Sequence, residues 1–294
     1  MSIETEYRAL FPETSFDRRR FLSTSAAAGV GVGFAAAVQP VMAQTMITTD
    51  TQGLVAGVVS IGDSRTPAYR AKPIGAGPFP LVIVVSEIFG VHEHIADVCR
   101  RLAKVGYYAI APEFFVRQGD VKTGEMSKVM GVVAQVPDVQ VLTDCDAALA
   151  FAGVDGGDLA RSAITGFCWG GRIVWLYSAQ NPRIKAGVAW YGRLTDSFNA
   201  ALNPTTALSI APKLRAPVLG LYGEKDQGIP QDGIVKMKAA LAAADATPAA
   251  RKSEFVVYPE AGHAFNADYR PSYVKSAADD GWTRMLAWFK ANGV

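Results

Sequence analysis

The sequence has few of the residues from which covalent or metal-bound frameworks are built. Its 294 residues include only three cysteines and three histidines. Cysteines this few and this scattered predict neither a disulfide framework nor a zinc site. Basic and acidic residues nearly balance, at 29 and 27, for a formal net charge of +2. Because no Lys/Arg-rich face is evident, this charge balance gives no reason to expect nucleic-acid binding.

The three histidines are His92, His94 and His263, so a histidine-dependent mechanism must use one of them. His92 and His94 lie two residues apart, which is not the i, i+4 spacing of a helical metal-binding pair. We therefore expect helix-start or solvent roles for these two, and neither a metal nor another cofactor. Cys99 and Cys145 fall on predicted helices, where burial would make them inert; a bond between them has no support in the sequence.

The N-terminus resembles a twin-arginine export signal. Arg18-Arg19-Arg20-Phe21-Leu22 precede a stretch of Ala, Gly and Val over residues 23–38, which is short and glycine-rich for a membrane span. Small residues end this segment at Ala43, where we expect cleavage. A short anchor or an N-terminal helix is the alternative. The expectation is a signal at residues 1–43, use of the twin-arginine export machinery, and a periplasmic or secreted protein with no stable membrane insertion.

The remainder, residues 44–294, reads as one domain. Half of the sequence is hydrophobic and 19% is charged, which supports a well-buried core. A polar segment over 45–52 is expected to be a loose tail. Apolar runs predict strands, the first two as a hairpin, at 54–59, 67–71, 81–85, 107–112, 163–167, 186–191, 217–222 and 254–258. Apolar residues at helical spacing predict helices at 95–105, 139–151, 172–179, 233–244 and 273–291.

This alternation predicts an α/β protein with a doubly wound, mostly parallel sheet and helices on both faces. The irregular stretch over residues 192–212 is expected to form a small cap. At the end of the strand over 163–167 stands Gly166-Phe167-Cys168-Trp169-Gly170-Gly171, which has the form of a nucleophile elbow. The flanking glycines are what a sharp, strained turn around a nucleophile requires. The alternative is that Cys168 is a small buried hydrophobe, as most free cysteines are.

Two other strand ends supply partners for Cys168, because functional groups gather beyond the carboxyl ends of parallel strands. One strand is followed by Asp226 and the next by His263, in the nucleophile–acid–base order of α/β-hydrolases. His263 would exchange the proton of Cys168, and Asp226 would orient the imidazole. Glu224 is the runner-up acid, and each group also has an ordinary turn or loop role as its alternative.

The loop after the first core strand begins with Ser86-Glu87-Ile88-Phe89-Gly90. In this fold the equivalent loop donates one backbone N–H to the oxyanion hole, and the residue after the nucleophile donates the other. Ile88 and Trp169 are therefore the expected donors. Glu87 also lies at the end of a strand. A charged side chain among apolar neighbours is unusual there and calls for an explanation.

These residues together resemble the dienelactone hydrolase (carboxymethylenebutenolidase) family, over essentially all of residues 44–294. The resemblance is carried by Glu87–Gly90, Ala111–Gly119, Gly166–Gly171, Tyr191-Gly192, Gly223–Asp226 and Gly262–Phe265. It implies an α/β-hydrolase fold, a Cys–His–Asp triad, and cofactor-free hydrolysis of a small lactone or ester.

The resemblance also implies roles outside the triad. The glutamate matching Glu87 contacts the resting thiol and helps the thiolate form, the arginine matching Arg117 holds a substrate carboxylate, and the tyrosine matching Tyr191 lines the pocket. The family's second carboxylate-binding arginine comes shortly after the catalytic histidine, but here the first arginine after His263 is Arg270, seven positions on. Acyl transfer or another thiol hydrolysis on the same triad, and a non-catalytic binding descendant of the fold, are the competing hypotheses.

Overall fold

The computed structural model describes residues 46–63, 65–123 and 125–294. The expected signal over 1–43 and its cleavage point lie outside the described residues, so both stay predictions. Within the described ranges, no helix is both long enough and apolar enough to cross a membrane.

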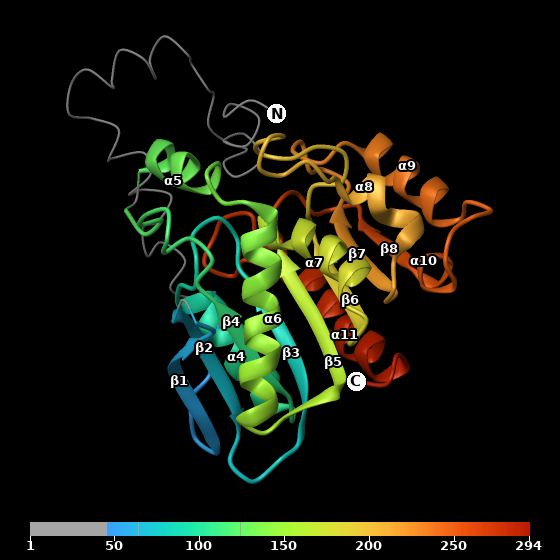
Figure 1. Ribbon diagram of the computed structural model, residues 1–294. Coiled ribbons are helices and arrows are strands. Elements are labelled where there is room, and N and C mark those ends of the chain that lie inside the picture. Colours follow the sequence, from blue (N-terminus) through green and yellow to red (C-terminus); the bar gives the residue numbers. More distant parts are fainter. Residues whose placement is uncertain (1–45, 64, 124) are drawn as a thin grey trace, which may run out of the picture.

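A central sheet of eight strands organises the molecule (Figure 1). The strands are β1 (Leu54–Ile61), β2 (Thr66–Pro73), β3 (Phe79–Val85), β4 (Tyr108–Pro112), β5 (Gly157–Phe167), β6 (Ile184–Trp190), β7 (Val218–Gly223) and β8 (Glu254–Tyr258). Their order across the sheet is β1-β2-β4-β3-β5-β6-β7-β8. The opening hairpin pairs antiparallel, and β2 joins β4 antiparallel, whereas all other neighbours are parallel. The predicted α/β-hydrolase architecture is confirmed.

Helices cover both faces of the sheet. They are α4 (Glu93–Lys104), α5 (Met126–Val133), α6 (Asp138–Val154), α7 (Trp169–Gln180), α8 (Ala207–Ile210), α9 (Gln231–Leu241), α10 (Pro248–Lys252) and α11 (Lys275–Ala291), with the 3-10 turn η2 (Ala211–Lys213). In Figure 1, α6 crosses in front of the sheet. It shares one core with α7, and α4 and α11 share a second core on the opposite face.

The alternation of side chains along a strand divides the two cores. Leu81, Ile83 and Val85 of β3 pack in the core with α6 and α7, and Val82 and Val84 pack in the core with α4 and α11. Successive side chains of a strand point to opposite faces, so a strand buried on both sides must be apolar throughout. All five side chains are fully buried, which is why the sequence shows a continuous apolar run here.

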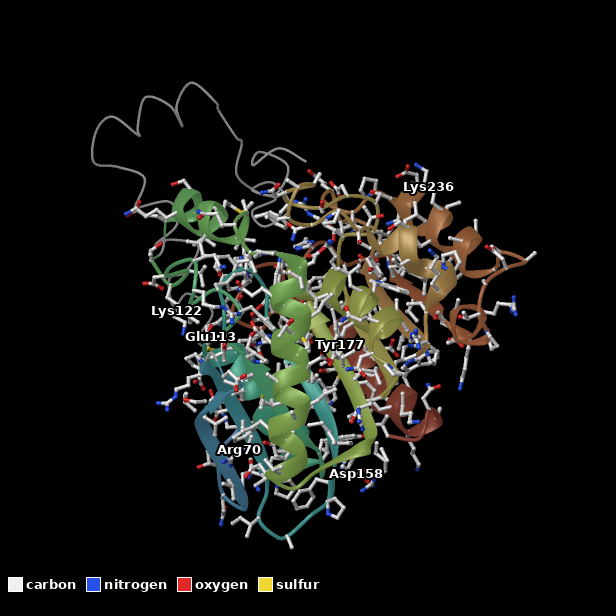
Figure 2. The ribbon with its side chains drawn as sticks, viewed as in Figure 1. Arg70, Glu113, Lys122, Asp158, Tyr177 and Lys236 are labelled. Carbon is white, nitrogen blue, oxygen red and sulfur yellow. The ribbon has the colours of Figure 1, made fainter. Side chains whose placement is uncertain are left out.

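Charged side chains lie mostly outside these cores. Figure 2 shows Lys122, Asp158 and Lys236 at the outer edge of the molecule. Tyr177 lies between α6 and α7, where its hydroxyl donates to Oδ1 of Asp146 at 2.7 Å. This hydrogen bond pairs the polar end of a buried ring and links the two helices on this face of the sheet.

The segment before β1 is not a loose tail, so this expectation was wrong. The N–H of Ile47 donates to Asp268 at 3.3 Å, and the N–H of Thr49 donates to Asp97 of α4 at 2.5 Å. Nζ of Lys104 lies 2.6 Å from Oδ1 of Asp50. The first two contacts use backbone N–H groups of the segment, and such groups carry no signal in the sequence pattern.

The irregular segment over residues 192–212 is bound to the α6–α7 face. Arg172 of α7 makes two hydrogen bonds of 2.7 Å to the carboxylate of Asp138, and Nδ2 of Asn203 donates to the same carboxylate at 2.9 Å. The hydroxyl of Tyr222 donates to the carbonyl of Gly192 at 3.0 Å. The sequence patterns also missed the short helices α5, α8 and α10.

The elbow glycines generate a stability prediction. A Cβ atom on Gly170 would lie 2.4 Å from the carbonyl oxygen of Val85, so Gly170→Ala must push β3 and α7 apart. We expect a loss of about 2–3 kcal/mol of unfolding free energy, measured by urea denaturation. Gly131→Ala is the control, because Gly131 lies exposed in α5 with no atom near its added Cβ; this change should be neutral or stabilising by up to about 1 kcal/mol. Equal stability of the two variants would contradict the packing argument.

Candidate active site

Cys168 occupies a strained turn between β5 and α7. Its backbone has φ 54° and ψ −114°, a conformation that costs a non-glycine residue roughly 1–3 kcal/mol. The crowding around it explains the flanking glycines, since a Cβ atom on Gly166 would lie 2.5 Å from the carbonyl oxygen of Gly170. The N–H of Cys168 donates to the carbonyl of Trp190 at 3.0 Å and ties the turn to β6. The predicted elbow is thus present in the backbone.

The other two cysteines have no part in this turn. Cys99 on α4 and Cys145 on α6 are fully buried in the two opposite cores, and all three thiols are free. Burial raises the pKa of both the Cys99 and the Cys145 thiol, which keeps them protonated and unreactive. The expectation that these two are inert is consistent with their surroundings.

His263 and Asp226 meet beside the turn. Nδ1 of His263 lies 2.8 Å from Oδ2 of Asp226, a distance at which the ring N–H donates to the carboxylate. Oδ1 of Asp226 accepts the N–H of Gly228 at 2.8 Å, and both side chains are buried. Glu224, the runner-up acid, is exposed. The structure therefore brings Asp226, and not Glu224, to the histidine.

The second ring nitrogen of His263 is available for proton transfer. Nε2 is buried without a hydrogen-bond partner among the described residues. Burial opposes protonation of His263, but the carboxylate of Asp226 and the neighbouring Cys168 raise its pKa well above 6.5. A histidine held by a carboxylate beside a thiol is placed to take the thiol proton.

The backbone N–H groups proposed for the oxyanion hole are available. Trp169 is the first residue of α7, where helix N–H groups have no acceptor within the helix. The N–H of Ile88 makes no hydrogen bond to another residue of the described ranges. Ile88 follows β3, the strand next to β5 in the sheet, so both groups lie at the carboxyl ends of neighbouring strands.

Glu87 is paired with a histidine rather than with the thiol. Its Oε2 lies 3.1 Å from Nε2 of His92, and its Oε1 has no partner among the described residues. Burial works against ionisation, yet the hydrogen bond from His92 and the positive charges of His92, His94 and Arg270 lower the pKa of Glu87 to about 2. Glu87 is consequently a buried carboxylate with one oxygen still free to accept.

Tyr191, Tyr269 and Arg270 surround the same space. The Tyr191 ring meets His263 edge-on at 5.2 Å, and the hydroxyls of both tyrosines are buried without a partner among the described residues. The guanidinium of Arg270 lies 4.8 Å from the ring centre of Phe89 and 5.0 Å from that of Tyr269. Burial disfavours its charge, but Tyr269, Glu87 and Cys168 raise the pKa of Arg270. Arg270, whose place the sequence left open, is thus buried beside Phe89 and Tyr269.

Comparison with known proteins decides the family. The model of the "Dienelactone hydrolase family" matches residues 66–293. The chain belongs to the dienelactone hydrolase family. A Methylorubrum extorquens protein named as a candidate carboxymethylenebutenolidase is 56% identical over 298 residues, covering 100% of this chain and 99% of that protein. Its Escherichia coli K12 counterpart is 54% identical and covers 89% of this chain and 96% of its own length.

Solved structures agree with this assignment. A dienelactone hydrolase candidate from Klebsiella pneumoniae superposes with a TM-score of 0.76 at 55% identity, covering 81% of this chain and 98% of that one. A dienelactone hydrolase-like phosphotriesterase from metagenomic libraries has a TM-score of 0.64 at 22% identity, covering 82% and 99%, and supports the fold alone. The protein is accordingly a hydrolase that acts on ester or lactone bonds.

Arg117 is paired with a carboxylate of α6. Its Nη1 lies 3.0 Å from Oδ1 of Asp144, and its Nη2 pairs with the other oxygen of that carboxylate. Nη1 also lies 3.3 Å from the hydroxyl of Thr66, at the start of β2. The guanidinium is thus directed to α6. A carboxylate-binding role for Arg117 stays a prediction, and it requires the ion pair with Asp144 to open.

Sequence reasoning missed several residues of this site. His92 and His94 do stand at the start of α4, as expected, but each also contacts a carboxylate: Glu87 and Asp268, respectively. The available signal was their position just beyond β3, where functional groups gather. Among the described residues, no group of three or more His, Cys, Asp or Glu side chains is arranged to hold a metal ion.

The choice of acid can be tested directly. In Asp226→Asn the amide cannot hold His263 in the right tautomer or stabilise its cation, so we expect kcat to fall by about 10³ or more. The matched change Glu224→Gln, two residues away on the surface, should alter kcat less than about twofold. Steady-state ester hydrolysis measures both. A larger loss in Glu224→Gln than in Asp226→Asn would contradict the assignment.

Proposed function

We propose that the protein hydrolyses a small lactone or ester through Cys168, His263 and Asp226, with a thioester intermediate. The single observation that carries the proposal is the strained Cys168 beside His263, whose other ring nitrogen is held by Asp226 at 2.8 Å. A thiol attacks a carbonyl carbon as the thiolate, so it needs a base within reach, and the elbow turn holds Cys168 where His263 can act as that base. Membership of the family supports hydrolysis of an ester or lactone bond. The assignment of Cys168 as the nucleophile rests on the geometry.

The proposed cycle moves one proton through His263 in each of its two halves. In the first half, the thiol proton moves to Nε2 of His263, and the thiolate of Cys168 attacks the carbonyl carbon. The N–H groups of Ile88 and Trp169 stabilise the tetrahedral oxyanion. Its collapse breaks the ester C–O bond, and the His263 imidazolium gives its proton to the departing alkoxide. In the second half, His263 takes a proton from water as the water oxygen attacks the thioester; collapse of the second tetrahedral intermediate breaks the C–S bond and releases the acid, and His263 returns the proton to the Cys168 thiolate.

We further propose that the substrate carries a carboxylate and that Arg270 holds it. Arg270 lies in the pocket with the unpartnered hydroxyls of Tyr191 and Tyr269, and an arginine beside two hydroxyl donors is suited to a carboxylate. A Bradyrhizobium relative, 30% identical over 78% of this chain, is named as a candidate lactonase of 2-oxo-3-(5-oxofuran-2-ylidene)propanoate, a lactone that bears a carboxylate. Negative charge on Glu87 nearby would favour release of the acidic product.

Removal of the nucleophile tests the triad. Cys168→Ala should lower kcat/KM for ester hydrolysis by at least about 10³, because attack by the thiolate is lost while the oxyanion donors remain. Cys168 is packed in a tight turn but contributes only one small side chain, so the thermal midpoint should shift by no more than a few degrees. Undiminished turnover in a folded variant would exclude the mechanism. Product that appears on an added alcohol instead of water would identify an acyltransferase.

The position of the carboxylate site is tested with matched pairs of esters that differ only by a remote carboxylate. Arg270→Gln should lower kcat/KM for the charged ester by about 10²-fold or more, and for the neutral ester by less than about fivefold. Arg117→Gln is the comparison variant and should affect both esters equally. A selective loss in Arg117→Gln, with none in Arg270→Gln, would return the carboxylate site to Arg117.

A further inference from the structure

A second buried histidine–carboxylate pair lies next to the strand that leads into the Cys168 turn. Nδ1 of His94 is 3.0 Å from Oδ1 of Asp268, and each side chain is 1% exposed. The spacing and burial resemble those of His263 and Asp226, at 2.8 Å with side chains 6% and 0% exposed. The proposed mechanism uses only the His263 pair. The His94–Asp268 pair therefore has no assigned role.

The free nitrogen of His94 lies among the groups of the pocket. Nε2 is buried and has no hydrogen-bond partner among the described residues. The ring stacks with His92 at 6.1 Å, lies 5.2 Å from Tyr269, and meets Phe167, the residue before Cys168, edge-on at 6.2 Å. A buried, unpartnered nitrogen in such a place is expected to face a group that arrives during the reaction or a neighbouring carboxylate.

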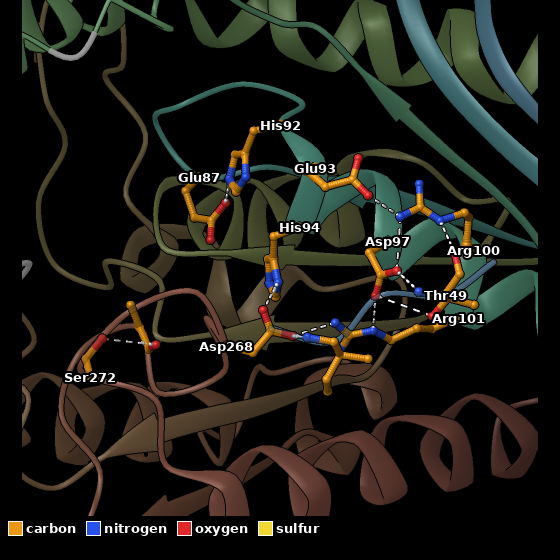
Figure 3. Close-up of polar contacts among 12 residues, drawn as sticks. Thr49, Glu87, His92, Glu93, His94, Asp97, Arg100, Arg101, Asp268 and Ser272 are labelled. Atoms are coloured by element: carbon orange, nitrogen blue, oxygen red, sulfur yellow. Dashed lines mark hydrogen bonds and ion pairs between the residues drawn. The ribbon is translucent and has the colours of Figure 1, made fainter. Parts of the chain in front are cut away.

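The carboxylate beside it is Glu87. His92 is bonded to Glu87 at 3.1 Å, and the ring of His94 stacks on that of His92. Figure 3 shows Glu87 bonded to His92, and His94 bonded to Asp268. The charged and titratable groups around His94 are Glu87 and His92 before α4, Asp268 and Tyr269 after His263, and Arg101 behind Asp268.

Asp268 is held from behind, so the pair has a rigid support. Its Oδ2 lies 2.5 Å from Nη2 of Arg101 and accepts the N–H of Ile47 at 3.3 Å. Arg101 also pairs with Asp97, which in turn accepts the N–H of Thr49 (Figure 3). Helix α4 and the segment before β1 thus fix the orientation of His94 from two sides.

The loop that carries Glu87 touches the turn that carries Cys168. A Cβ atom on Gly170 would lie 2.6 Å from the carbonyl oxygen of Ser86, the residue before Glu87. An anion at Glu87 therefore opposes a thiolate at Cys168 unless cations compensate it. Resting on the proposed nucleophile, we propose that His94, oriented by Asp268, is a positioning residue: stacked on His92, which is bonded to Glu87, it keeps the Glu87 carboxylate compensated, so that Cys168 can become a thiolate.

The test measures the reactivity of the thiol and needs no substrate. His94→Asn places an amide N–H near the former Nδ1, which can still donate to Asp268, and removes Nε2. The rate of Cys168 alkylation by iodoacetamide, followed by mass spectrometry as a function of pH, reports thiolate formation. We expect the midpoint of the rate–pH profile to rise by about one pH unit, equivalent to about tenfold slower alkylation below the midpoint. Thermal unfolding should show an unchanged fold.

The control is Lys104→Gln, also on α4. Lys104 pairs with Asp50 in the segment before β1 but makes no contact with the dyad, so its profile should match that of the wild type. A folded His94→Asn variant whose profile coincides with the wild type would overturn the proposal. If His94→Asn does not fold, the same rate–pH profile is measured for His94→Gln and Asp268→Asn, with the same expected shift and the same contradicting result. Wild-type Cys168 that reacts no faster than Cys99 and Cys145 would instead contradict the proposed function itself.

Discussion

The site depends on a backbone constraint: β5, β6 and α7 approach one another at Cys168 more closely than side chains would permit. A Cβ atom on Gly192 would lie 2.3 Å from the carbonyl carbon of Gly171, and one on Gly170 would lie 2.4 Å from the carbonyl oxygen of Val85. This contact between bare backbones holds Cys168 at φ 54°. Strain of this kind persists only where the surrounding structure over-determines it, and here it places a buried thiol at the carboxyl ends of the strands.

Around this turn each of three buried carboxylates has a histidine partner. Asp226 faces His263, Glu87 faces His92, and Asp268 faces His94, with Arg270 buried nearby. One short loop from His263 to Arg270 carries the base, the support for His94 and the arginine together. Since a buried charge is costly without a partner, each ion here constrains the position of another. The loop is itself tied through Asp268 to α4 and to the segment before β1.

The sequence predicted the scaffold well, because the signals for it are periodic. Runs such as Leu81–Val85 identify strands buried on both faces, and the strand-end rule then placed Asp226 and His263 next to Cys168. Side-chain pairs between separate elements leave no periodic pattern in the sequence. The pairing of Arg117 with Asp144 and of His94 with Asp268 could therefore not be predicted from it. Anchors made by backbone N–H groups, as at Thr49, leave no mark on the sequence at all.

The most direct test of the central claim is to trap the acyl-enzyme. A slowly hydrolysed aryl ester is mixed with the protein, the reaction is stopped with acid at short times, and the intact mass and peptide map are recorded. We expect an added acyl group on Cys168 that forms and decays at rates consistent with turnover, and none in Cys168→Ala. Turnover with no acyl group on Cys168 at any time, or with the group on another residue, would contradict it.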